Sequence, residues 1–257
     1  MDQKEGGARQ SAEEAPRQIT YSRAMTNDSV TNSKFLRAKM VDTQLLDRGI
    51  SDVNVLRAML QVPREKFVRS IDIEFAYEDS PLTIGSDQTI SQPFMVAVMI
   101  EALGLQTGDK VLEIGAGSGY AAAVLSEITK NVFAIERIRS LVELAKSNLA
   151  AAGYNNVQLR HGDGTEGWPE ASPFDAILVS AGAPHVPRTL EEQLKIGGRM
   201  IIPIGKDLND QILVRITRTG EEDFKTENLG HVHFVPLIGD EGWHIDSLGR
   251  ISDGLDA

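Results

Sequence analysis

The chain has 257 residues, of which 41% are hydrophobic, and its formal net charge at pH 7 is −11. This length and apolar content predict a packed globular protein, and the negative charge argues against a nucleic-acid groove, which requires clustered Lys and Arg. The chain contains no cysteine, which excludes disulfides, thiolate catalysis and thiolate metal sites and fits a reducing compartment.

The N-terminal stretch carries charge throughout and lacks the apolar core of a secretory signal. No apolar run approaches the roughly 18 residues that span a bilayer. We therefore expect a cytoplasmic monomer with neither a membrane nor a nucleic-acid partner. Residues 1–32 are expected to form a polar, flexible extension, because they offer little apolar surface to bury.

The following segment, residues 33–104, is expected to form a helical cap and a substrate loop. Apolar spacing predicts a helix over residues 34–50, which Gly49 ends, and a second over 51–68, opened by Ser51 or Asp52 and broken at Pro63. Residues 76–93 are rich in Gly, Pro, Ser and Asp and are predicted to be a loop. Residues 93–105 form an apolar helix.

From residue 105 to 242, predicted strands and helices alternate. Strands are expected over 110–115, 131–136, 156–164, 174–182 and 199–205, and helices over 120–129, 140–154 and 187–198. Residues 211–220 and 224–239 are expected to form a closing antiparallel β-hairpin. This order predicts an α/β fold with a doubly wound, mostly parallel sheet, whose ligands bind at the carboxyl ends of the strands. Residues 243–257 form a C-terminal tail.

The sequence VLEIGAGSGY places Gly115, Gly117 and Gly119 where the first strand of this sheet passes into a helix. Glycines at such a turn let a nucleotide-like ligand approach the backbone. The spacing is one residue shorter than the dinucleotide fingerprint G-x-G-x-x-G. Glu113 precedes the turn and can face a cationic amine, and Glu136 ends the second strand, where an acid can bind ribose hydroxyls. Two acids in these places favour S-adenosylmethionine as the cofactor.

Several motifs in the chain resemble those of one enzyme family. VLEIGAGSGY, AIE and GDG are similar to successive motifs of S-adenosylmethionine-dependent methyltransferases of the Rossmann-like class I fold. QTISQP, FDAILVSAGAPHVP and HFVPL resemble the protein-L-isoaspartate O-methyltransferases, and RAKMVDTQLLDRGI and VPREKFV resemble the N-terminal helices of their bacterial form. The similarity covers about residues 34 to 240.

The resemblance implies methyl transfer from S-adenosylmethionine, with S-adenosylhomocysteine as product, to the free α-carboxylate of L-isoaspartyl residues in damaged proteins and peptides. The ester then cyclises to a succinimide without the enzyme, and hydrolysis of the succinimide partly restores aspartate. Ser91 is implied as the catalytic residue, and Asp163 as the contact to the adenine amino group. The implied cofactor contacts are Glu113, Gly115, Gly117, Ser118, Gly119, Glu136, Arg137, Gly162 and Asp163. The implied substrate contacts are Gln88, Thr89, Ile90, Ser91, Val235 and Pro236.

Several alternatives remain open on the sequence. Ser91 could instead cap the following helix, Val235 and Pro236 could be ordinary sheet core, and Asp163 could simply form a turn. The chain could methylate another substrate, or bind the cofactor as an inactive scaffold, although the intact QTISQP segment speaks against the scaffold. Asp87 stands where the bacterial pattern has Gly. We expect no metal site, because the five histidines lack ligand spacing on a helix.

Overall fold

The computed structural model of the protein describes residues 32–246, 248 and 250–253. Its centre is a seven-stranded sheet with the order β5-β4-β3-β6-β7-β8-β9. The first five of these strands run parallel to one another, and β8 and β9 are antiparallel additions at one edge. The strands of this sheet are β3 (Lys110–Ile114), β4 (Asn131–Glu136), β5 (Val157–His161), β6 (Phe174–Val179), β7 (Leu194–Asp207), β8 (Asp210–Arg218) and β9 (Phe224–Val232).

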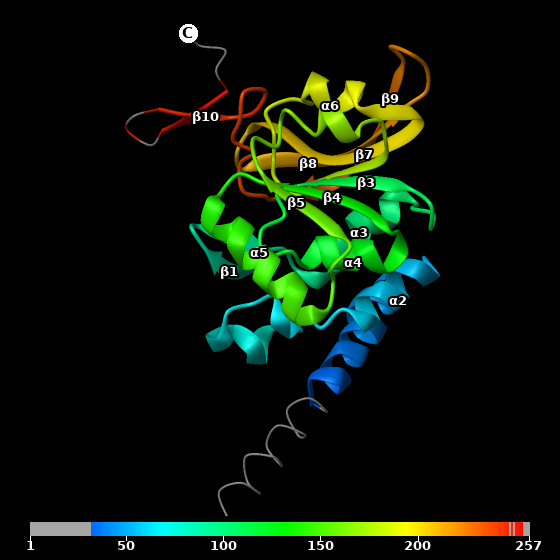
Figure 1. The fold of residues 1–257 in the computed structure, drawn as a ribbon, viewed down its shortest axis with the longest axis vertical. Helices are drawn as coiled ribbons and strands as arrows, with labels where there is room; N and C mark the ends of the chain where they lie inside the picture. Colours follow the sequence, from blue (N-terminus) through cyan, green and yellow to red (C-terminus); the bar gives the residue numbers. More distant parts are fainter. Residues whose placement is uncertain (1–31, 247, 249, 254–257) are drawn as a thin grey trace, which may run out of the picture.

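Helices cover both faces of the sheet, as the predicted doubly wound fold requires. The helices are α2 (Val53–Gln61), α3 (Pro93–Leu103), α4 (Tyr120–Ile128), α5 (Arg139–Ala152) and α6 (Arg188–Glu192). In Figure 1, α3, α4 and α5 lie on one side of the sheet and α6 lies on the other. Alternate residues of β3 enter two separate cores, since Val111 packs on the α3–α4 side and Leu112 packs on the α6 side.

The strand order reverses beside β3. The chain moves outward from β3 through β4 to β5, then returns to the other side of β3 with β6. Such a switch point leaves a crevice at the carboxyl ends of the central strands. The glycine turn after Ile114 lies at that crevice.

The N-terminal cap is helical as predicted, with a different internal geometry. Residues 32–40 are helical, Val41–Leu45 form a π-helical turn and Leu46–Arg48 form a 3₁₀ turn that ends at left-handed Gly49. Asp52 caps α2 by accepting hydrogen bonds from the backbone amides of Asn54 and Val55 at 2.8 and 3.2 Å. Residues 1–31 of the predicted flexible extension lie outside the described residues.

Three predicted elements were wrong. The predicted loop 76–93 contains a two-stranded hairpin, β1 (Leu82–Gly85) and β2 (Gln88–Ile90). The helix predicted over 187–198 ends at Glu192, because Leu194 already pairs with Phe174 as the first residue of β7. The second arm of the closing hairpin stops at Val232, so the VPL segment lies outside β9.

The last described residues form a small element of their own. His244–Ile245 (β10) and Ile251–Ser252 (β11) pair as an antiparallel ribbon that projects beyond the sheet, in red in Figure 1. The buried Trp243 anchors this ribbon, because its indole N–H donates to the carbonyl of Gly182 at 3.0 Å. No helix within the described ranges is both long and apolar enough to span a membrane.

Candidate functional site

The glycine turn has the geometry that a close ligand approach requires. Gly115, Gly117 and Gly119 have φ values of +82°, +55° and +88°. The requirement for glycine is clearest at Gly117, where a Cβ atom would lie 3.1 Å from Cδ1 of Ile84 in the β1–β2 hairpin. A branched side chain there would have both an unfavourable φ and a steric conflict. The predicted turn between strand and helix is therefore present.

Glu136 fixes this turn through the backbone. Its Oε2 accepts a hydrogen bond from the amide of Gly117 at 2.9 Å, and its Oε1 accepts one from the amide of Ile138 at 2.8 Å. The side chain is 6% exposed at the end of β4. Each carboxylate oxygen keeps a further lone pair, so hydroxyl groups of a ligand can still bind it. Glu136 thus joins the glycine turn to the start of α5.

Glu113 stands out because its buried carboxylate is not fully satisfied within the described part of the chain. It is 1% exposed on β3, and its Oε2 has no hydrogen-bond partner. Burial and the nearby charge of Glu136 raise the pKa of Glu113 well above its ordinary value. The hydroxyl of Ser118 is also buried and unpartnered. Both residues line one small cavity of about 50 Å³ at the glycine turn.

These two unpartnered groups match the amino-acid end of S-adenosylmethionine. A buried carboxylate offers an acceptor for an ammonium group, and a serine hydroxyl can donate to a carboxylate. Buried polar groups in proteins are nearly always hydrogen-bonded, so two orphans in one cavity indicate a ligand with complementary groups. The residues present therefore fit the cofactor that the sequence predicts.

A larger cavity of about 410 Å³ continues from the turn along the carboxyl ends of β3 and β4. The predicted residues Gly115, Gly117, Glu136 and Arg137 line it on one side. Its walls also contain predicted substrate residues, namely Gln88, Thr89, Val235 and Pro236. Leu237 of the VPL segment also lines it, and sequence reasoning missed the rest of the apolar lining, which consists of Ile114, Ile135, Ile138, Ile238, Ile245 and Ile251.

The β1–β2 hairpin carries the predicted substrate residues Gln88, Thr89 and Ile90. Its turn is formed by Ser86 and Asp87, which have φ values of +52° and +55°. Two consecutive left-handed residues are typical of the type I′ turn that joins adjacent antiparallel strands. Asp87 therefore occupies a conformation in which glycine has no steric cost, and both turn residues line the 410 Å³ cavity.

Ser91 follows this hairpin and is half-buried. The N-cap of α3 is Gln92, and no side chain makes a capping hydrogen bond there, so the alternative role of Ser91 as the helix cap is wrong. Ser91 lines a third cavity, of about 710 Å³, together with Met95, Asn209 and His233. It also lines the small cavity that contains Glu113. The backbone carbonyl of Ser91 accepts a hydrogen bond from Nη2 of Arg64 at 2.8 Å.

Val235 and Pro236 lie in an irregular segment, residues 233–243, whose first half lines the 410 Å³ and 710 Å³ cavities. Pro236 makes an isolated parallel bridge to Gly182, in the loop after β6. Gln211 holds the start of the segment, because its Oε1 accepts from the amide of Phe234 at 2.8 Å and its Nε2 donates to the carbonyl of the same residue at 3.0 Å. Side-chain and backbone contacts, rather than a sheet ladder, place the two residues.

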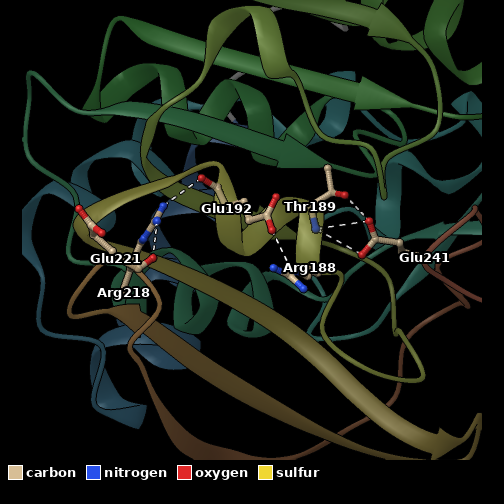
Figure 2. Close-up of polar contacts among 6 residues, drawn as sticks. All are labelled: Arg188, Thr189, Glu192, Arg218, Glu221 and Glu241. Atoms are coloured by element: carbon tan, nitrogen blue, oxygen red, sulfur yellow. Dashed lines mark hydrogen bonds and ion pairs between the residues drawn. The ribbon is translucent and has the colours of Figure 1, made fainter.

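Glu241 ties the other end of segment 233–243 to α6. Its carboxylate accepts hydrogen bonds from the backbone amide and the hydroxyl of Thr189. Figure 2 shows Glu241 reaching this helix beside the Arg188–Glu192 ion pair, with Arg218 donating to the carbonyl of Glu192. The contacts of Figure 2 therefore support the site from outside the cavities.

Asp163 also helps to hold segment 233–243 in place. Its Oδ1 accepts from the amide and the hydroxyl of Thr165, each at 2.8 Å, and its Oδ2 accepts from the amide of Asp240 at 2.8 Å. Asp163, Gly162 and Gly119 do not line the three cavities described above, whereas Gly164 lines the 410 Å³ cavity. The contact predicted between Asp163 and adenine therefore has to share a carboxylate that already accepts three hydrogen bonds.

Within the described ranges, no three His, Asp or Glu side chains are grouped as metal ligands.

Comparisons with known proteins agree with this geometry. Residues 36–242 match the family model described as protein-L-isoaspartate(D-aspartate) O-methyltransferase (PCMT). The protein-L-isoaspartate O-methyltransferase 1 of Rhodopseudomonas palustris (strain HaA2) is 55% identical over 217 residues, which cover 84% of this chain and 89% of that protein.

Solved structures give the same result. One described as a protein-L-isoaspartate O-methyltransferase superimposes with a TM-score of 0.73 at 35% identity, covering 80% of this chain and 67% of that chain. A Plasmodium falciparum structure, described as this kind of methyltransferase in complex with S-adenosyl-L-homocysteine, has a TM-score of 0.70 at 29% identity. It covers 79% of this chain and 98% of that chain.

Proposed function

The chain belongs to the protein-L-isoaspartate(D-aspartate) O-methyltransferase family, and from this premise we propose which of its residues perform the reaction. The protein is an S-adenosylmethionine-dependent enzyme that methylates L-isoaspartyl residues of damaged proteins and peptides. The methyl group is transferred to the free α-carboxylate, which initiates repair through a succinimide.

The observation that carries the assignment is the meeting of two cavities at shared residues. Thr89, Ser180, Val235 and Pro236 line both the 410 Å³ cavity on the glycine turn and the 710 Å³ cavity beside Ser91. Two ligands bound in adjoining cavities can bring their reacting groups together at this boundary. The first cavity suits the cofactor, and the second suits a peptide that enters from the surface.

The cofactor site would use the residues of the glycine turn and the two buried acids. Glu113 and Ser118 would bind the amino-acid end, Gly115 and Gly117 would allow close approach to the backbone, and Glu136 would bind ribose hydroxyls. Arg137 and the apolar lining, including Ile135 and Ile138, would surround the adenine side of the cavity. When bound, S-adenosylmethionine supplies a methyl group on a sulfonium that is already activated for displacement.

The substrate carboxylate needs orientation rather than deprotonation. An α-carboxyl group has a pKa near 3.5 and is ionised at pH 7, so no side chain has to act as a general base. The Ser91 hydroxyl would donate to one carboxylate oxygen and direct the other toward the methyl group. Gln88, Thr89 and Ile90 would border the peptide on one side, with Val235 and Pro236 on the other. Positioning then supplies most of the rate acceleration.

A paired-peptide assay tests this function. The enzyme is incubated with S-adenosylmethionine and either an isoaspartyl peptide or the aspartyl peptide of the same sequence, and methyl ester formation is measured. We expect methylation of the isoaspartyl peptide only. Equal methylation of both peptides would show that the carboxylate is not selected, and methylation of neither would remove the substrate assignment.

The oligomeric state and the cellular compartment of the enzyme are also proposed. The enzyme is proposed to act as a monomer. The lack of cysteine supports work in the reducing cytoplasm. Sedimentation of the purified protein tests the first point, and cell fractionation tests the second.

A further inference from the structure

Arg64 is a fully buried arginine beside the proposed active site. It begins the 3₁₀ turn Arg64–Lys66, directly after Pro63, and is 0% exposed. Its hydrogen bonds go to backbone carbonyls: Nε donates to Ala76 and Nη2 donates to Ser91, each at 2.8 Å. The third nitrogen, Nη1, has no partner.

Burying this group is expensive. An ion taken out of water loses favourable solvation unless an opposite charge or a full set of hydrogen bonds replaces the water. Burial lowers the pKa of the Arg64 guanidinium. Partial compensation comes from the ring of Tyr120, the first residue of α4, whose centroid lies 4.7 Å from the guanidinium carbon. An apolar residue would fill the same space without this cost.

The two carbonyls that Arg64 binds lie on either side of the β1–β2 hairpin. Ala76 precedes the β1–β2 hairpin and Ser91 follows it, so one guanidinium holds both ends of the segment 76–91. This segment carries Gln88, Thr89 and Ile90. Arg64 also contacts Tyr120, which lines the small cavity together with Glu113 and Ser91.

We propose that Arg64 is a positioning residue for methyl transfer: its guanidinium clamps both ends of the segment 76–91 and thereby fixes Ser91, which lines both the small cavity of Glu113 and the 710 Å³ cavity. The inference rests on the proposed function. It requires a planar fork of donors, because the two carbonyls must be held in a fixed relation to each other. A lysine keeps the charge but presents a single ammonium on a flexible stem.

Arg37 provides a matched control. It is also buried, at 8% exposure, and its Nη1 also donates to a backbone carbonyl, that of Gln61, at 2.8 Å. It belongs to the same helical cap but, within the described part of the chain, its side chain donates no hydrogen bond to segment 76–91. Arg37→Lys and Arg64→Lys therefore remove the same chemistry at two places, of which only one holds the substrate hairpin.

The decisive measurement is a double-mutant comparison with Ser91→Ala. Single-turnover methylation of an isoaspartyl peptide is measured at saturating S-adenosylmethionine, and S-adenosylhomocysteine affinity is measured by calorimetry. We expect Arg64→Lys to reduce the rate about tenfold with cofactor affinity within about threefold, and Arg37→Lys to stay within about twofold of wild type. In the Ser91→Ala background, Arg64→Lys should have little further effect, because it acts through Ser91.

Three outcomes would overturn the clamp. They are multiplied losses in the Arg64→Lys, Ser91→Ala double variant, an equal loss in Arg37→Lys, and a loss of S-adenosylhomocysteine binding in Arg64→Lys. Amide hydrogen exchange over residues 82–90 separates this inference from the proposed function. Even if wild type fails to methylate the isoaspartyl peptide, the clamp predicts faster exchange there in Arg64→Lys than in Arg37→Lys. Equal exchange in the two variants would contradict it.

Discussion

Replacing Glu113 by glutamine should stabilise the ligand-free protein and weaken cofactor binding at the same time. Glu113 is 1% exposed and its Oε2 has no partner, so its charge is uncompensated until a cation binds. Burial and the charge of Glu136 raise its folded-state pKa. Between the unfolded and the folded pKa, the folded protein holds a proton that the unfolded chain lacks. Stability therefore falls as pH rises through this window and stays low above the folded pKa.

Two magnitudes follow from this arrangement. An unsatisfied buried polar group costs about 1–3 kcal/mol, and more when it is charged. Glutamine keeps the shape without the charge, so we expect Glu113→Gln to gain about 1–3 kcal/mol above the folded pKa, or roughly 2–10 °C in Tm. A hydrogen bond between two charged groups contributes about 1.5–3 kcal/mol, so S-adenosylmethionine affinity should fall by about 10- to 150-fold.

Thermal unfolding tests the expected gain in stability of Glu113→Gln, and calorimetry tests its expected loss of cofactor affinity. Tm is measured without ligand from pH 5 to 9, and Glu113→Gln should flatten the decline that wild type shows as pH rises. Glu143→Gln serves as the control, because its side chain is 67% exposed and neither quantity should change there. A lower Tm in Glu113→Gln combined with unchanged S-adenosylmethionine affinity would refute the reasoning, since Glu113 would then be satisfied by the protein itself.

Four further variants probe the remaining parts of the site. Ser91→Ala should slow methylation of an isoaspartyl peptide about tenfold with cofactor affinity within a few-fold, and an unchanged rate would remove its role. Gly117→Val should abolish S-adenosylhomocysteine binding in calorimetry, because the residue has a φ of +55° and an added Cβ would lie 3.1 Å from Cδ1 of Ile84. Asp87→Gly should raise the free energy of unfolding by about 0.5–1 kcal/mol in a urea titration, since φ is also +55° there. Replacing Ile245 and Ile251 by Ser should weaken S-adenosylhomocysteine binding about three- to tenfold, and equal affinity would exclude the β10–β11 ribbon from the site.

The sequence predicted the central sheet well because its local signals agree with its tertiary structure. Short apolar runs mark buried parallel strands, and Gly153 ends α5 in the left-handed conformation that glycine favours. Where the local sequence pattern and the tertiary contacts conflict, the tertiary contacts determine the secondary structure. Leu194 follows a helical pattern in sequence but pairs with Phe174, and this ladder ends the predicted helix at Glu192.

The substrate segment was harder to predict because its strands are short. β1 has four residues and β2 has three, and the turn between them uses Ser86 and Asp87 rather than the usual glycine. Composition therefore indicates a loop. The contribution of Ile245 and Ile251 leaves even less signal, since each belongs to a strand of two residues beyond the part of the chain that matches the family.

The three acids of the site illustrate what the sequence lacks. Glu113 is the last residue but one of β3, Glu136 ends β4 and Asp163 follows β5, and composition gives no reason to rank them. Their oxygens differ in what already satisfies them: Glu136 accepts from two backbone amides, and Asp163 holds Thr165 and the amide of Asp240. Glu113 alone among the three has a buried oxygen without a partner. An unpaired buried oxygen destabilises the ligand-free protein, and a bound ligand can supply the missing hydrogen bond. Glu113 is therefore the acid whose replacement should most clearly separate stability from cofactor binding.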